Sequence, residues 1–426
     1  MVVQRKNVIL ITIDVLRKDM LGCYGNDKGL TPFIDSLAEK STLFTRMQAT
    51  GPYTQASFPG ILTSSYYLEY GKPTRLSTKR TIVSEVLKKG GITTVGFHSN
   101  PYLSEAAGWN RGWDVFYDSM QDDVEPMLPY IRGEKINEKT IKWLNSYVEG
   151  DYKPFFLWVH YMDVHEPYVP EREFVDMVYP EISMNKDAMF DLFKNYIIKQ
   201  NVSNPEKVQL LKQLYEIHVR EADTYVETLF KALEDKGVLK DSVVIITSDH
   251  GDEFNEHGGL SHRDKMYSEL IDTPLFIYGT GRNGECDALV SNVDISPTIT
   301  HLFGADPAPN WEGRSFLPLD QSSPKGCFGE AIDQKSKKGG DMDRDIYFYR
   351  EEDLKIIYRP IENRWEMYDL QVDPSEQNNI VDSHPRAEEM KAILKPRARR
   401  WSTDRPGGGG GRPRRPGRGR VFGARK

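Results

Sequence analysis

The sequence predicts an α/β protein with a mostly parallel central sheet, helices on both faces and a small C-terminal α+β subdomain. Two observations support this fold class. Short, continuously apolar segments alternate with longer amphipathic segments, and polar clusters follow directly after two of the apolar segments. A chain of 426 residues is long enough for one large domain of this class and a smaller module.

Four segments have the composition of strands buried on both faces. The first is NVILITI at 7–13, which is continuously apolar and rich in β-branched residues. The other three are TTVGFHS (93–99), PFFLWVHYM (154–162) and SVVIITS (242–248). Strands of this kind, separated by helical segments, indicate a parallel sheet covered on both faces.

Three segments between these strands have helical patterns. TPFIDSLAEKS (31–41) follows a turn and is amphipathic, and KRTIVSEVLKKGG (79–91) ends in basic residues and glycine. The longest pattern covers residues 210–237 and ends in Lys-Gly. These helices would supply the layers above and below the sheet.

The character of the chain changes after about residue 325, so we expect residues 1–325 to form the α/β domain. Residues 345–370 have the pattern of antiparallel strands joined by turns, and a helix is expected near 384–395. We therefore expect a subdomain over 326–395. The segment 396–426 is rich in Arg, Gly and Pro and is predicted to be disordered.

Charge and composition exclude several classes of protein. The net charge is −7, but the segment 396–426 carries ten Arg and one Lys against one acid, so the remaining residues are strongly acidic. Binding of nucleic acid through the body is therefore not expected. No apolar run is long enough to span a membrane. The three cysteines form no C-x-x-C motif, and no signal peptide is recognised, which favours a cytoplasmic protein with reduced thiols.

Polar residues directly follow two of the predicted strands. Asp14 follows the strand at 7–13, and Asp249 and His250 follow the strand at 242–248. If these strands are neighbours, their carboxyl ends bring two carboxylates and an imidazole together, a set that suits Mn²⁺, Mg²⁺ or Zn²⁺. The alternative for Asp14 is a helix cap. A purely structural role also remains open for the Asp249-His250 pair.

Further reactive side chains lie in other loops. The segment YTQASFPGILTS (53–64) offers two hydroxyls, Thr54 and Ser57. His165 follows the strand at 154–162, and His262 follows the Asp249 cluster. Three other histidines are less informative, since His160 is expected to pack inside a strand and His98 and His257 remain undecided. Carboxylates, imidazoles and a hydroxyl at strand ends are what metal-assisted ester cleavage requires.

Eight stretches, in this order, resemble the sulfatase family of the alkaline phosphatase superfamily, and they extend over residues 7–385. They are NVILITIDVLRKDMLGCYG, TPFIDSLAEKSTLF, HYMDVHEPY, ITSDHGDEFNEHG, HRDKMYSELIDTPLFIYG, VSNVDISPTITHLFG, EGRSFLPL and WEMYDLQVDPSEQNNI. The resemblance implies an alkaline phosphatase-like α/β fold and ester hydrolysis in the domain at 1–325.

The family's nucleophile motif, C/S-x-P-x-R, is changed in this chain. Ser57-Phe58-Pro59 matches its first half, but Ile61 stands at the arginine position. Counting back nine residues from Thr63, which matches the threonine of the family's Leu-Thr-Gly ending, places Thr54 at the reactive position. We favour this second alignment.

A threonine nucleophile changes the expected chemistry. The family oxidises its Cys or Ser to formylglycine, and the β-methyl group of Thr54 prevents formation of that aldehyde. The chain thus resembles lipoteichoic-acid and phosphoglycerol transferases, which attack phosphorus with a threonine. By that resemblance Asp14, Thr54, Asp249 and His250 hold one divalent metal ion (Mn, Mg, Zn or Ca). Val15 replaces a second carboxylate that sulfatases often carry.

The resemblance assigns the remaining candidates by position. His165 and His262 would contact the transferring group or protonate the leaving alcohol. Asn100 and Arg17 would contact substrate, although Arg17 could equally form a surface salt bridge. We expect a metal-dependent hydrolase of small sulfate or phosphate esters, with phosphate favoured. The alternatives are a true sulfuric ester hydrolase, a phosphoglycerol-type transferase, and an inactive scaffold or binding module.

Overall fold

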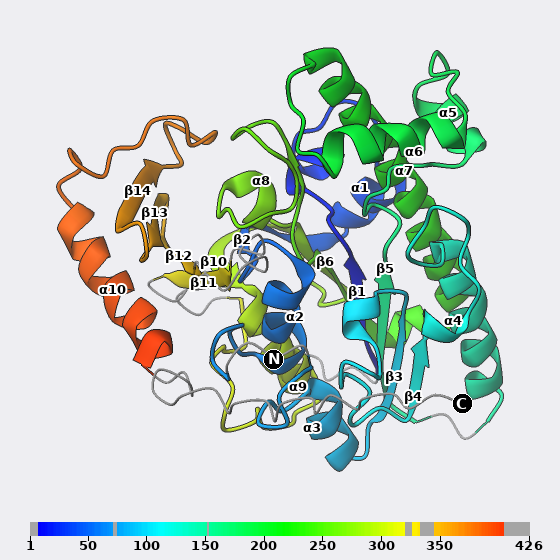
Figure 1. Cartoon of the computed structure of the whole chain (residues 1–426). Coiled ribbons are helices and arrows are strands. Elements are labelled where there is room, and N and C mark those ends of the chain that lie inside the picture. Colours follow the sequence, from blue (N-terminus) through cyan, green and yellow to red (C-terminus); the bar gives the residue numbers. More distant parts are fainter. Residues whose placement is uncertain (1–6, 71–74, 151–152, 320–325, 333–344, 404–426) are drawn as a thin grey trace, which may run out of the picture.

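The computed structural model describes residues 7–70, 75–150, 153–319, 326–332 and 345–403 (Figure 1). An eight-stranded sheet has the order β10-β2-β9-β6-β1-β5-β3-β4. Its strands are β1 (Asn7–Ile13), β2 (Ser41–Gln48), β3 (Thr93–His98), β4 (Val115–Asp118), β5 (Phe155–Tyr161), β6 (Ser242–Ser248), β9 (Leu275–Tyr278) and β10 (Gly284–Ser291). Strand β9 runs antiparallel to both of its neighbours, and the other pairs in this sheet are parallel.

The four strands predicted from the sequence are confirmed as β1, β3, β5 and β6, and they are neighbours in the sheet. β1 lies between β5 and β6 and pairs with both in parallel register. All seven residues of β1 are buried, as its continuous apolar pattern predicts. The loops after β1, β5 and β6 therefore meet at one edge of the sheet.

Helices cover both faces of the central sheet, which confirms the predicted layers. Alternate residues of β1 enter different hydrophobic cores, because successive side chains of a strand point to opposite faces. On one face, Ile9 and Ile11 share a core with α1 (Pro32–Ala38), α4 (Gly133–Val148) and α7 (Pro205–Asp235).

The opposite face has a core of its own. Val8 and Leu10 share it with α2 (Thr54–Thr63), α3 (Val83–Lys89) and α9 (Ile295–Leu302). This second layer matters for the site, because α2 carries the stretch in which the two candidate hydroxyls lie.

A second, antiparallel sheet forms the small C-terminal part of the chain, which Figure 1 shows beside the central sheet. Its strands are β11 (Cys327–Ile332), β12 (Asp345–Glu351), β13 (Leu354–Arg359) and β14 (Arg364–Asp369). Helix α10 (Ala387–Thr403) packs against it through Met390 and Leu394, which are fully buried. The expected strands and terminal helix are confirmed.

The prediction of disorder from residue 396 onwards is wrong for 396–403. Helix α10 continues to Thr403, because the chain still finds packing partners beyond Pro396. Ala398 is buried, and the guanidinium of Arg397 lies 3.7 Å from the centre of the Tyr66 ring. The rest of the segment, 404–426, lies outside the described residues.

The structure also bears on membrane insertion. In the part of the chain that it describes, no helix has the length and apolar character needed to cross a bilayer.

Candidate active site

The site is built where two adjacent parallel strands end. Ile13 of β1 pairs with Ser248 of β6, so Asp14 and Asp249 emerge side by side. The Nε2 atom of His250 lies 3.6 Å from Oδ1 of Asp14 and 3.4 Å from Oδ2 of Asp249. The three side chains are fully buried. The predicted convergence of Asp14, Asp249 and His250 thus occurs in the structure.

The hydrogen bonds of this group leave one atom of each side chain available as a metal ligand. Oδ1 of Asp249 accepts hydrogen bonds from the backbone N–H groups of Val15 and His250, at 3.2 and 3.0 Å. Nδ1 of His250 lies 3.1 Å from the carbonyl oxygen of Gly251, which can only accept, so Nδ1 carries the proton. One buried atom of each side chain has no hydrogen bond to any described residue: Asp14 Oδ1, Asp249 Oδ2 and His250 Nε2. Two carboxylate oxygens and an imidazole nitrogen left in this way fit a divalent metal ion.

The Thr54 side chain also lies next to Asp14. Thr54 is the first residue of α2, and its Oγ1 lies 3.5 Å from Oδ2 of Asp14. The amide nitrogen of Asn100 lies 2.7 Å from that carboxylate oxygen and 3.3 Å from Thr54 Oγ1. The hydroxyl of Ser57 instead donates to the backbone carbonyl of Thr54, at 3.3 Å. The structure therefore places the hydroxyl of Thr54, rather than that of Ser57, beside the Asp14 carboxylate.

The N-terminus of α2 adds a second influence on Thr54. Aligned peptide dipoles make the first turn of a helix electropositive. An oxyanion on the first residue of this ten-residue helix is stabilised by that field. Thr54 is 3% exposed, so little water competes for its hydroxyl.

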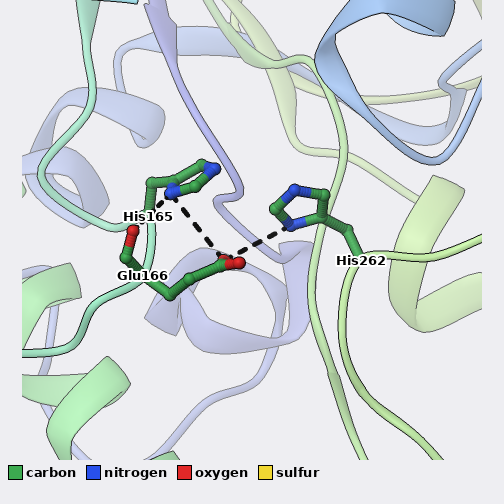
Figure 2. A group of neighbouring side chains, drawn as sticks. All are labelled: His165, Glu166 and His262. Atoms are coloured by element: carbon green, nitrogen blue, oxygen red, sulfur yellow. Dashed lines mark hydrogen bonds and ion pairs between the residues drawn. The ribbon is translucent and has the colours of Figure 1, made fainter. Parts of the chain in front are cut away.

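Two further imidazoles, His165 and His262, lie close to these residues. His165 follows β5, and His262 follows β8 (Leu260–Ser261). Their ring centroids are 5.0 Å apart, and the His262 ring lies 4.6 Å from that of His250. Figure 2 shows both rings turned towards the carboxylate of Glu166, which lies 3.7 Å from His165 Nδ1 and 3.5 Å from His262 Nδ1.

Acceptors behind these two rings fix their tautomers. His165 Nδ1 lies 2.6 Å from the carbonyl oxygen of Glu166, and His262 Nδ1 lies 2.8 Å from a carboxylate oxygen of Asp252. Both Nδ1 atoms therefore carry protons, and the Nε2 atoms are left for other partners. His165, Glu166 and His262 could also hold an ion by their mutual distances. The Asp14 group fits better because its three donor atoms lack hydrogen bonds to the described residues, whereas both Nδ1 atoms of the outer histidines are engaged.

Electrostatics in the site support cation binding. Burial and the neighbouring Asp14 charge raise the pKa of Asp249 well above its ordinary value. Burial also opposes ionisation of Asp14, but the hydrogen bond from His160 and the charge of His165 keep the pKa of Asp14 below its usual range. Burial lowers the pKa of His250 to about 3, so this imidazole is neutral. A bound cation would offset the repulsion between the two carboxylates.

The outer imidazoles differ in basicity. Burial lowers the pKa of His262 to about 4, although Glu166 acts against this. Burial also opposes protonation of His165, but the charges of Glu166 and Asp14 outweigh it and raise the pKa of His165. Of these two residues, His165 is therefore the one that is more readily protonated near neutral pH.

Three residues of the site were not assigned to it from the sequence. Glu166 and Asp252 support the outer histidines, and His160 contacts Asp14 Oδ2 through Nε2 at 3.2 Å. Glu166 stands next to His165, and Asp252 stands two positions after His250, so proximity to predicted residues was the available signal. His160 lies inside β5, as expected, but it is a hydrogen-bonding residue and not merely a packed one.

The side chain of Arg17 forms no hydrogen bond or ion pair, within the described structure, with Asp14, Thr54, Asp249 or His250. Its guanidinium is buried and pairs with Asp19 and Glu256, each at 2.7 Å, and it donates to the carbonyl of Asp252 at 2.8 Å. These contacts support the salt-bridge alternative, with a buried guanidinium and carboxylate partners that are partly exposed. A substrate contact through Arg17 has no support in this geometry.

The two undecided histidines are also placed elsewhere. His98 is buried and stacks on Trp158, with ring centroids 5.6 Å apart. His257 pairs with Glu269 at 2.6 Å and stacks on Tyr267 at 3.6 Å. The contacts of both rings therefore lie away from the carboxylates of the site.

Comparison with known families agrees with these features. A family model described as "Sulfatase" matches residues 6–305, and one described as "N-sulphoglucosamine sulphohydrolase, C-terminal" matches residues 255–403. An N-acetylglucosamine-6-O-sulfatase of Bacteroides thetaiotaomicron is 21% identical over 92% of this chain and 85% of its own length. An arylsulfatase of Clostridium perfringens is 23% identical over 92% of this chain and 93% of its own length.

Solved structures share the fold. The phosphonate monoester hydrolase of Agrobacterium radiobacter has a TM-score of 0.76 and 18% identity, covering 93% of this chain and 95% of that chain. A protein solved in complex with its substrate D-glucosamine-2-N,6-O-disulfate has a TM-score of 0.73 and 21% identity, covering 94% and 99%. At these identities the likeness establishes the architecture and not the substrate.

Proposed function

The chain belongs to the sulfatase family, and we propose that it is a metal-dependent hydrolase of small phosphate esters or diesters that works through a covalent intermediate on Thr54. The single observation that carries this proposal is the position of the Thr54 hydroxyl. It lies 3.5 Å from Oδ2 of Asp14, whose other carboxylate oxygen is one of the three ligand atoms that lack hydrogen bonds to the described residues.

The choice of phosphorus follows from the chemistry of a threonine. Its hydroxyl is a secondary alcohol, which cannot be oxidised to an aldehyde, so the intermediate cannot be expelled by collapse of a hydrated aldehyde. The Thr54 ester must instead be broken by a second attack on the central atom. Phosphorus accepts such an attack readily.

In the first step, Thr54 Oγ1 attacks phosphorus as the alkoxide, its proton having passed to solvent, and the bond from phosphorus to the leaving alcohol breaks. The alcohol oxygen takes its proton from an imidazolium, for which His165 is suited by its raised pKa, with His262 beside it. In the second step, water attacks phosphorus, Thr54 Oγ1 leaves, and the same imidazole accepts the proton of the water.

The other residues orient the reacting groups. The Asn100 amide donates to Asp14 and lies within reach of Thr54 Oγ1, so it fixes the distance between the nucleophile and the carboxylate. We propose that Asp14, Asp249, His250 and Thr54 hold one Mn, Mg, Zn or Ca ion. Such an ion, when bound, favours the alkoxide form of a hydroxyl and offsets negative charge on the reacting group.

Hydrolysis of sulfate esters is the second candidate, and the names of the two sequence relatives favour it. Transfer of a phosphoglycerol-type group to an alcohol other than water is a further variant of the same chemistry. The acidic composition of residues 1–395 supports a small substrate rather than nucleic acid. A cytoplasmic location stays a prediction from the sequence.

A substrate comparison tests this proposal. Metal-loaded protein would be given bis(4-nitrophenyl) phosphate, 4-nitrophenyl phosphate and 4-nitrophenyl sulfate under identical conditions. We expect metal-dependent cleavage of a phosphate substrate, with the sulfate turned over far more slowly. Dominant cleavage of the sulfate would overturn the phosphate assignment and favour the second candidate.

A further inference from the structure

We infer that His160 is a positioning residue for the metal site: together with Thr12 and Trp158, it holds the Asp14 carboxylate so that Oδ1 faces the cation. This role rests on the proposed function, since it presupposes that Asp14 binds a metal ion. Nothing in the sequence pattern indicated it, because His160 lies inside a strand.

The sheet register brings these residues together. In the pairing of β1 with β5, Thr12 lies opposite His160. Side chains two positions apart in a strand share a face, so Thr12 and Asp14 face the same layer, as do Trp158 and His160. That layer is the one that contains α2, which supplies Thr54.

The hydrogen bonds along this face have one consistent direction. The indole N–H of Trp158 can only donate, and it donates to Thr12 Oγ1 at 3.0 Å. The second polar partner of Thr12 Oγ1 among the described residues is His160 Nδ1, at 2.8 Å. The Thr12 hydroxyl therefore donates its proton to Nδ1. In a neutral imidazole the ring proton then lies on Nε2.

His160 Nε2 thus donates to Asp14 Oδ2, at 3.2 Å. The amide of Asn100 donates to the same oxygen at 2.7 Å. Oδ2 accepts from these two donors and from the Thr54 hydroxyl at 3.5 Å, whereas the buried Oδ1 receives no hydrogen bond from the described part of the chain. The carboxylate is held in one orientation, with its free oxygen on the side of Asp249 and His250, and so binds a cation through Oδ1.

The packing around His160 makes this orientation rigid. The ring is fully buried, and it lies edge-on to Phe58 at 5.0 Å and nearly parallel to Trp158 at 5.9 Å. A rotamer change would require these aromatic rings to move. Ligands fixed in this way lose little conformational entropy when the cation binds.

Binding of Mn²⁺ to the metal-free full-length chain, measured by calorimetric titration, tests this role without an activity assay. His160→Phe keeps an aromatic ring in the packed layer but removes the donor to Asp14. Loss of an outer hydrogen bond to a metal ligand typically weakens metal affinity about 10- to 100-fold, and we expect a loss in that range. His160→Gln, which restores an N–H donor, should recover part of it.

His98 provides the matched control. It lies opposite His160 on the neighbouring strand β3 and stacks on the same Trp158 ring, but its ring contacts lie away from Asp14. His98→Phe should therefore leave the Mn²⁺ affinity within about twofold of that of the unmodified chain. This change is much smaller than the loss expected when a hydrogen bond to a metal ligand is removed. An equal loss in His98→Phe and His160→Phe would overturn the inference, because packing alone would then explain it.

Thr12→Val tests the chain of donors independently of His160. Valine has nearly the same shape but cannot donate to His160 Nδ1, so the ring is free to place its proton on Nδ1. We expect weaker Mn²⁺ binding, and no further loss when Thr12→Val is added to His160→Phe. Unchanged affinity in both single variants would overturn the positioning role. Failure of the unmodified chain to bind any of Mn²⁺, Mg²⁺, Zn²⁺ and Ca²⁺ would instead overturn the proposed function.

Discussion

The Thr54 hydroxyl lies 3.5 Å from Oδ2 of Asp14, although the two residues are 40 positions apart and belong to different elements. Asp14 directly follows the central strand β1, whereas Thr54 begins helix α2 on one face of the sheet. Their contact joins the proposed nucleophile, at the positive end of a helix, to a carboxylate at the edge of a parallel sheet. The predictions below follow from this arrangement and from the buried charges around it.

Replacement of Thr54 should remove catalysis. Thr54→Ala leaves no hydroxyl beside Asp14, and loss of a nucleophile typically lowers kcat by roughly 10³-fold or more. Thr54→Ser keeps the hydroxyl and should retain measurable turnover. Steady-state rates with bis(4-nitrophenyl) phosphate would report both effects.

Ser57 is the matched comparison for that experiment. Its hydroxyl is fully buried and bonded to a backbone carbonyl, so Ser57→Ala should keep most of the activity. Mass spectrometry of the peptide that contains residues 53–64 should find no formylglycine. An inactive Ser57→Ala variant, or an aldehyde at Ser57, would contradict the assignment of Thr54.

Removal of divalent metal should abolish turnover and destabilise the fold. Without a cation, two buried carboxylates lie close together, and burial with the Asp14 charge raises the pKa of Asp249. Treatment with a chelator should stop the reaction and lower the thermal midpoint, and adding back Mn²⁺ should restore both. Elemental analysis should find one equivalent of metal in the untreated protein and less in Asp249→Asn. Full activity after chelation would contradict a metal-dependent mechanism.

Arg17 should matter for stability rather than for substrate affinity. Its guanidinium is buried between Asp19, Glu256 and a backbone carbonyl. Arg17→Ala removes a charged hydrogen bond to the Asp252 carbonyl, whereas the two carboxylates are partly exposed to water, and we expect a loss of roughly 2 kcal/mol of unfolding free energy. Urea denaturation measures this change. A variant of unchanged stability with a greatly raised KM would restore the substrate-contact interpretation.

His257 should make the stability depend on pH. Its Nδ1 lies 2.6 Å from Glu269 Oε1, and its Nε2 lies 3.2 Å from the carbonyl oxygen of Glu376, so two acceptors face one ring. Only the doubly protonated ring can donate to both. Burial opposes this charge, but the hydrogen bond and charge of Glu269 outweigh it and raise the pKa of His257.

The sign of that effect follows from the raised pKa. The folded chain binds the His257 proton more tightly than the unfolded chain, so the stabilisation is complete below the unfolded pKa of about 6.5 and is lost as pH rises through the higher folded value. Urea midpoints measured as pH rises from about 6 should fall more steeply for the unmodified chain than for His257→Gln. Parallel curves would show that His257 contributes no such dependence.

Much of the fold was predictable from local patterns. Continuous apolar runs identified β1, β3, β5 and β6 because strands buried on both faces need no polar positions. The boundary at residue 396 was not predictable in this way. Its composition suggests disorder, but packing of Arg397 on Tyr66 and burial of Ala398 belong to a helix that continues to Thr403.

The sequence by itself determined that Asp14, Asp249 and His250 would stand at strand ends, because the end of an apolar run is visible in the order of residues. It did not determine which strands are neighbours. Only the packed fold set β5 beside β1 and β3 beside β5, and so placed both His160 and Asn100 against Asp14. The physical reason is that hydrogen bonds between side chains depend on sheet order and register, which non-local packing sets and local periodicity does not record.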